Sequence, residues 1–76
     1  MEKIVEVIRE LNPYDDFDEN TNLIEEGIID SLRLVILINE LEDVFDTKIP
    51  EAEIKPENFE TVTAIWKLIE RTKKIF

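Results

Sequence analysis

Apolar residues recur at steps of three and four in three stretches of the chain, and this spacing predicts three helices. Such spacing puts the apolar side chains on one helical face, which can pack against a core. The stretches cover residues 2–11, 31–45 and 61–73. Pro13 ends the first because proline disfavours helical geometry in the preceding residue, and Thr61 is the expected N-cap of the last. The core-facing positions are Ile4, Val7, Ile8 and Leu11; Leu34, Leu37, Ile38, Leu41 and Phe45; and Val62, Ile65, Trp66 and Ile69.

Two polar connections join the predicted helices. The first, residues 12–30, is long, and such loops in a compact domain are usually functional or pinned by their own side chains. The second, residues 46–60, holds two prolines and is typical of a loop with a short helix or single turns. The side chains expected to pin the connections are Tyr14, Phe17, Leu23, Ile24 and Ile28 or Ile29 in the first, and Ile49, Ile54 and Phe59 in the second.

The composition favours an all-α fold in one domain covering residues 1–76. One glycine and three prolines are too few turn residues for a protein rich in β-hairpins. The chain has no cysteine and no histidine, so disulfides are excluded and a structural zinc site is not expected. Stability must come from apolar packing, for which 43% hydrophobic residues are sufficient.

The charge is strongly acidic, with 19 acidic and 9 basic residues and a net charge of −10. Phosphates of nucleic acids and anionic lipid surfaces repel such a chain, whereas partners with basic patches attract it. The alternative is that the acidity only provides solubility. The opening residues are amphipathic, unlike a signal peptide, and no apolar run approaches the roughly 20 residues that span a bilayer. We therefore expect a soluble, cytoplasmic protein that does not insert into membranes.

A hydrolytic serine is not expected. Ser-His-Asp catalysis requires an imidazole to accept the serine proton, and the chain has none. A Ser-Lys pair stays formally possible, but 76 residues leave little room for a substrate pocket beside a core. We therefore predict that the protein is not an enzyme.

Four residues of the first connection match half of a calcium-binding EF-hand loop: Asp16, Asp18, Asn20 and Asn22. The glycine that makes the sharp turn of such a loop is replaced by Thr21, and the closing glutamate by Gly27. Local bonds between side chains and backbone explain these Asp and Asn residues better. No metal site is predicted.

The Asp30-Ser31 junction starts the most apolar predicted helix. Unpaired amides and the positive end of the helix dipole make this a favourable place for a phosphate group on Ser31. The alternative is that Asp30 or Ser31 only caps the helix, since both residue types are common caps. No Glu or Gln follows at position 33 or 34, so a capping box is absent.

Three apolar residues beside this serine, Leu32, Val35 and Ile36, fall off the core-facing stripe. An apolar cluster on a heavily charged protein is typical of a contact surface. The alternative is that the long connection folds over these side chains.

These residues resemble the acyl and peptidyl carrier proteins. The segment Gly27–Leu32, GIIDSL, is similar to their phosphopantetheine attachment motif, in which a glycine and two variable residues precede Asp-Ser-Leu. The segment Leu41–Pro50 resembles the end of the helix that follows, and Asn58–Val62 the start of their last helix. The resemblance extends over nearly the whole chain, in order and without large gaps.

The resemblance implies a four-helix bundle of acyl-carrier type, with three longer helices and a short third one. It implies that Ser31 receives 4′-phosphopantetheine from coenzyme A through a magnesium-dependent phosphopantetheinyl transferase. Asp30 would contact that transferase or its metal. The thiol of the arm would carry acyl or aminoacyl groups as thioesters between partner enzymes, and the carrier is expected to be a monomer. The alternative is a non-carrier acidic interaction domain in which Ser31 only caps a helix.

Departures from the fatty-acid type bear on the pathway. Fatty-acid carriers usually have acids two and five positions after the serine, where this chain has Arg33 and Ile36, so we expect these residues to select against fatty-acid synthase enzymes. The run Glu25–Ser31 is closer to D-alanine carriers of teichoic acid synthesis and to stand-alone peptidyl-type carriers, which an adenylating ligase charges. The expected partner-contact residues are Leu32, Arg33, Val35, Ile36, Glu40 and Asp43.

Overall fold

The computed structural model describes residues 2–73, which form three α-helices and two short 3₁₀ turns. The α-helices are α1 (Glu2–Leu11), α2 (Ser31–Val44) and α3 (Val62–Lys73). The 3₁₀ turns are η1 (Glu51–Glu53) and η2 (Pro56–Asn58). No strand occurs among residues 2–73, and the all-α class is confirmed. The two 3₁₀ turns stand where the short third helix of the bundle was expected.

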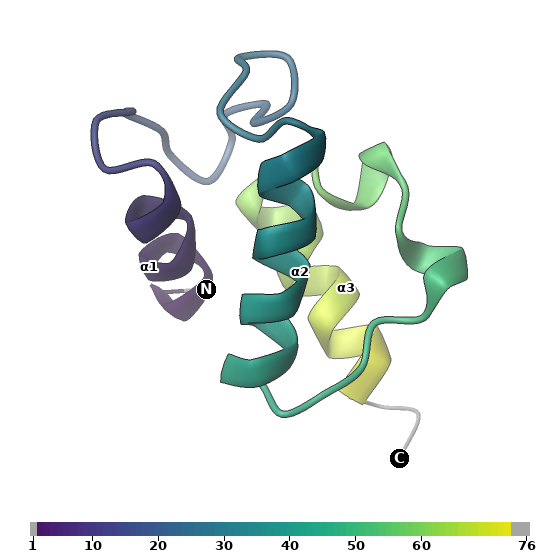
Figure 1. Ribbon diagram of the computed structural model, residues 1–76. Helices are drawn as coiled ribbons and strands as arrows, with labels where there is room; N and C mark the ends of the chain where they lie inside the picture. The colour runs from purple at the N-terminus through teal and green to yellow at the C-terminus, as the bar shows by residue number, and fades with distance from the viewer. Residues whose placement is uncertain (1, 74–76) are drawn as a thin grey trace.

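Helix α2 is the centre of the molecule. Figure 1 shows α1 on one side of α2, the connection with the two 3₁₀ turns on the other, and α3 crossing behind. The predicted stripes of the three helices meet in one core, together with residues from both connections. The fully buried large side chains are Ile4, Ile8, Leu23, Leu37, Leu41, Phe59, Val62, Ile65, Leu68 and Ile69. Within residues 2–73, no helix is long and apolar enough to cross a membrane.

The first connection is pinned largely as the sequence predicts. Leu23, Ile28 and Ile29 are buried, while Phe17 and Ile24 are half-buried and pack against the core. The prediction for Tyr14 is wrong, because its side chain is 99% exposed. Tyr14 follows the proline that ends α1, in a turn whose residues 13–16 all face outward.

The second connection is pinned at its two ends. Ile49 and Phe59 are buried, as predicted. Ile54, between η1 and η2, is 39% exposed, and the prediction that it packs inward is wrong. Ile54 follows a single 3₁₀ turn, and its neighbours Lys55, Pro56 and Glu57 are exposed as well, so the middle of this connection stays at the surface.

Candidate functional site

The residues that lead to Ser31 form one helical turn with a cap at each end. The Asn22 side-chain oxygen accepts hydrogen bonds from the amides two and three positions later, at 3.2 and 3.0 Å. At the other end, the Gly27 amide donates to the Ile24 carbonyl at 3.1 Å and the Ile28 amide to the Leu23 carbonyl at 2.9 Å. This is the pattern of a helix end closed by a left-handed residue, and Gly27 has a φ of +74°. The segment before the serine is therefore fixed by its own backbone.

Helix α2 begins with Asp30 as its cap. The Asp30 Oδ1 accepts a hydrogen bond from the Arg33 amide at 2.9 Å, and the Asp30 carbonyl accepts one from the Leu34 amide at 2.8 Å. Ser31 is thus the first residue of the helix, and the alternative that Ser31 caps it is wrong. Its side chain is exposed, and within residues 2–73 its hydroxyl has no hydrogen-bond partner. Ser31 is also the only serine of the chain.

A cleft of about 330 Å³ opens beside Ser31. Its walls come from the capped turn, from the first turns of α2 and from η2. The lining residues are Ile24, Gly27, Ile29, Asp30, Ser31, Leu34 and Pro56. Most of this lining is apolar, so the cleft suits the uncharged part of a group attached to the serine better than a charged one.

The wall that Pro56 forms is tied to α3 by polar side chains. The Glu53 carboxylate accepts hydrogen bonds from Arg71 at 3.1 Å and from the Asn58 side-chain amide at 3.0 Å. The same Asn58 amide donates to the Glu53 carbonyl at 2.7 Å. The hydrogen bond from Arg71 is the main reason that the pKa of Glu53 lies below its ordinary value. These contacts hold η1 and η2 against α3.

The apolar residues that the sequence places off the core stripe are exposed. The exposed fractions are 71% for Leu32, 56% for Val35 and 38% for Ile36. The alternative that the long connection covers them is therefore wrong. Glu40 and Asp43, also exposed, continue the line of Leu32 and Ile36 at steps of four and three along one side of α2. This surface, which we call the α2 face, is apolar next to Ser31 and acidic further away.

Arg33 differs from its neighbours on α2. Its side chain is half-buried, and its Nη1 donates a hydrogen bond of 3.3 Å to the Ile28 carbonyl. The sequence predicts Arg33 as a partner contact, whereas the structure shows its guanidinium engaged with the segment before the serine.

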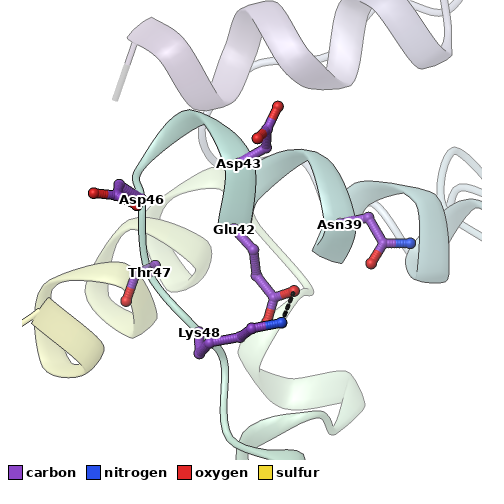
Figure 2. Close-up of a pocket in the computed structure, with 6 residues that line it drawn as sticks. All are labelled: Asn39, Glu42, Asp43, Asp46, Thr47 and Lys48. Atoms are coloured by element: carbon purple, nitrogen blue, oxygen red, sulfur yellow. Dashed lines mark ion pairs between the residues drawn. The ribbon is translucent and has the colours of Figure 1, made fainter.

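A second hollow, of about 440 Å³, lies at the far end of α2 and is shown in Figure 2. The carboxylates of Glu42, Asp43 and Asp46 point in different directions there. Glu42 is already engaged: it accepts the Ile49 amide at 2.8 Å and pairs with Lys48 at 3.9 Å. Within the part of the chain that the structure describes, no group of three or more His, Cys, Asp or Glu residues could hold a metal.

Two of the four residues that match half of an EF-hand loop, Asp18 and Asn22, form local hydrogen bonds with their side chains. The Asp18 carboxylate accepts hydrogen bonds from the Asn20 amide at 2.8 Å and from the Thr21 hydroxyl at 3.2 Å. Asn22 caps the turn that leads to Ser31. The explanation by local bonds between side chains and backbone is confirmed for Asp18 and Asn22.

Sequence reasoning missed two contributors to the site. Asn22 caps the turn before the serine, and its signal was present, since Asn before a Leu-Ile-Glu-Glu run is a common helix-start pattern. Pro56 reaches the cleft from 25 positions downstream of Ser31, and no local pattern indicates such a contact.

Comparison with known proteins places this geometry in a family. Residues 2–69 match the model of the phosphopantetheine attachment site. The D-alanyl carrier protein of Lactococcus lactis subsp. lactis (strain IL1403) is 36% identical over 74 residues, which cover 95% of this chain and 94% of that protein. The D-alanyl carrier protein of Listeria monocytogenes serotype 4b (strain CLIP80459) is 31% identical, with 95% of each covered. A chain in a crystal structure described as that of an FAD-dependent dehydrogenase is 42% identical, with a TM-score of 0.74, covering 86% of this chain and 94% of that one.

Proposed function

The chain belongs to the phosphopantetheine attachment family, and from that premise we propose that Ser31 is the residue that carries the group. The protein is a carrier that holds 4′-phosphopantetheine covalently and passes acyl or aminoacyl groups between enzymes as thioesters. Carriers of this family are in general not catalysts, and they work with a phosphopantetheinyl transferase and with ligases or synthases.

The observation that carries the proposal for Ser31 is its free hydroxyl at the start of α2. Because Asp30 takes the cap position, the serine oxygen is exposed and available to an incoming enzyme. A phosphodiester formed there lies at the positive end of the helix dipole, which favours its negative charge. The adjoining apolar cleft offers a surface for the uncharged part of the arm.

The transfer step follows from this placement. The Ser31 oxygen forms a bond to the β-phosphorus of coenzyme A, and the bond from that phosphorus to the adenosine bisphosphate breaks. The leaving group takes the electron pair, and in this proposal the serine proton passes to a base of the transferase. Magnesium and the base thus belong to the transferase, with Asp30 as a candidate contact. In this proposal the carrier itself catalyses nothing.

The α2 face is the proposed docking surface for the partner enzymes. Its exposed apolar part, Leu32, Val35 and Ile36, suits an adenylating ligase with an apolar contact surface. Its acidic end, Glu40 and Asp43, suits basic residues on the same partner, with an attraction that weakens as the salt concentration rises. A cytoplasmic location and a monomeric state stay predictions.

We propose an amino acid of the D-alanine type as the cargo, loaded by an adenylating ligase. The support is the set of D-alanyl carrier proteins of 31–39% identity that cover most of the chain. A second candidate is a cargo that a flavin enzyme oxidises while it is attached. It is supported by the chain of 42% identity in a dehydrogenase structure. That chain is itself of carrier size, because 86% of this 76-residue sequence covers 94% of it.

Incubation with coenzyme A, magnesium and a broad-specificity transferase, followed by intact mass measurement, tests the attachment. We expect one added phosphopantetheine on the wild type and none on Ser31→Ala. A matched control is Thr61→Ala, which removes a hydroxyl at the start of α3 instead and is expected to be modified normally. Modification of Ser31→Ala at the wild-type rate would overturn the proposal.

The two cargo candidates are separated with the holo protein. A D-alanine-activating ligase and ATP should add one alanyl group to it and none to the apo protein. The alternative outcome is that the loaded carrier bleaches the flavin absorbance of the dehydrogenase named with the solved structure. Bleaching means that two electrons have passed from the cargo to the flavin, and the second candidate then holds. Failure of D-alanine loading, with loading of another amino acid, would contradict the first.

A further inference from the structure

Arg33 holds the segment before Ser31 from two sides. Its backbone amide donates to the Asp30 carboxylate at 2.9 Å, and its guanidinium donates to the Ile28 carbonyl at 3.3 Å. Both partners lie within the three residues that precede the serine. A single residue of the first helical turn thus fixes both the cap of α2 and the end of the connection that enters it.

Ile28 lies between the loop and the Arg33 side chain and is hydrogen-bonded to both. The amides of Ile28 and Ile29 both donate to the Leu23 carbonyl, at 2.9 and 3.0 Å, and their side chains are buried in the core. The loop therefore holds the amides of Ile28 and Ile29, and the Arg33 guanidinium holds the Ile28 carbonyl. Without the guanidinium, the half-buried carbonyl must find water or rotate, and a rotation of that peptide changes the direction in which the chain enters α2.

The position of Arg33 in the charge pattern is also unusual. It is the only basic residue between Arg9 and Lys48, in a region rich in acids. The Arg33 guanidinium bonds back onto the loop of its own chain, whereas the side chains of the α2 face, such as Leu32, are exposed. Partner attraction by charge alone does not require the guanidinium to be half-buried and directed at a carbonyl of its own chain.

We propose that Arg33 is a positioning residue for phosphopantetheine transfer: it fixes the orientation in which the Ser31 hydroxyl is presented to the transferase. The inference rests on the proposed function, since it takes Ser31 as the attachment residue. The Arg33 guanidinium acts through the Ile28 carbonyl, and the reacting atoms remain those of Ser31 and coenzyme A. If the Ser31 hydroxyl points in another direction, transfer within the complex of carrier and transferase is slower, because the serine oxygen must be aligned with the phosphorus. Docking through the apolar α2 face is unaffected.

Steady-state kinetics of the transferase with Arg33→Met, Arg33→Lys and the wild type test this role. We expect kcat to fall about tenfold for Arg33→Met, with KM unchanged. Arg33→Lys keeps the charge and one donor and should recover most of the rate. The matched control, Lys48→Met, removes a cation at the other end of α2 and should leave both constants unchanged. Circular dichroism of the variants checks that the helices persist.

Amide hydrogen exchange supplies the second readout. In Arg33→Met the amides of Ile28 and Ile29 should exchange faster, while those in α3 should be unchanged. A rise in KM with unchanged kcat would overturn the inference and assign Arg33 to partner attraction. Wild-type kinetics in Arg33→Met would overturn it as well and would assign the guanidinium neither role. Those results differ from failure of the proposed function, in which Ser31→Ala would be modified like the wild type.

Discussion

The two long connections of this molecule are held in different ways. The connection before α2 places Leu23, Ile28 and Ile29 in the core, at 0–4% exposure, and closes a capped turn with backbone hydrogen bonds. Among the apolar residues of the connection after α2, only Ile49 and Phe59 are buried. Its 3₁₀ turns are attached to α3 by side chains that are partly exposed.

This difference matches what each connection contributes to the site. The first ends in the cap that precedes Ser31, and its fixed backbone gives this proposed attachment residue one backbone orientation. The second contributes Pro56 to the lining of the cleft. Because water competes with exposed ion pairs, contacts of this kind hold a segment weakly. The backbone before the serine is thus held by the core, whereas the wall beside it is held by weaker, partly exposed contacts.

The largest expected effect comes from emptying the core beneath the first connection. Leu23→Ala should lower the free energy of unfolding by about 3 kcal/mol, because it removes fully buried methyl groups and leaves a cavity. Urea denaturation measures the change. Leu32→Ala, which shortens an exposed leucine of the α2 face, is the control and should change stability little. Equal effects from the two substitutions would contradict the account of how the first connection is held.

The next largest effect on stability is expected at Gly27, the left-handed residue of the capped turn. Gly27→Ala should cost about 1 kcal/mol, because its φ of +74° disfavours any side chain even though open space surrounds the position. Gly27→Asn should cost less, since asparagine tolerates this conformation. Thermal or urea unfolding of both variants gives the ranking. An alanine variant as stable as the wild type would show that the turn is not required to keep its left-handed closure.

At the end of α2, the informative substitution introduces a glycine instead of replacing one. Asp46 occupies a left-handed position with a φ of 50°, and the Thr47 amide closes the helix end by donating to the Glu42 carbonyl at 3.1 Å. Asp46→Gly should therefore stabilise the protein by about 0.5 kcal/mol, whereas Asp46→Ala should not. Urea denaturation compares the two. A destabilising glycine would mean that the Asp46 side chain, not its backbone, matters at this end of the helix.

The smallest effect is expected from the polar contacts of the second connection, and it depends on pH. The pKa of Glu53 is lowered, chiefly by the hydrogen bond from Arg71. The ion pair therefore stabilises the folded state above the ordinary glutamate pKa of 4.5, and this contribution is lost as pH falls through the lower folded-state value.

The difference in stability between wild type and Arg71→Met should accordingly be present at neutral pH and shrink on acidification. Measured in a Glu53→Gln background, the same Arg71 substitution should show no such pH dependence. A difference that stays constant to low pH in the wild-type background would remove the ion pair from the account of the second connection.

Local patterns were enough to predict the helices. The bounds 2–11 were predicted as observed, α2 ends one residue before the predicted 45, and α3 begins just after its predicted cap Thr61. That cap is confirmed by a hydrogen bond of 3.0 Å from the Ala64 amide to the Thr61 hydroxyl. These features depend on residues a few positions apart, and sequence reasoning reads such short-range patterns well.

Contacts between residues far apart in the sequence were not predictable from local patterns. The same holds where two nearby residues suit one structural role equally well. Tyr14 and Phe17 are both aromatic residues in the first connection, yet only Phe17 packs inward, under the guanidinium of Arg9 at 5.9 Å. Asp30 and Ser31 are both good caps, and only the observed backbone shows that Asp30 takes the position. The reach of Pro56 to the cleft depends on how the second connection lies against α3.

The most direct test of the central claim is site-resolved mass spectrometry of the protein after reaction with coenzyme A and a phosphopantetheinyl transferase. We expect the added phosphopantetheine on Ser31, the only serine of the chain, and on no other residue. A fully modified protein whose peptide fragments place the group on a threonine or on Tyr14, with Ser31 unmodified, would contradict it.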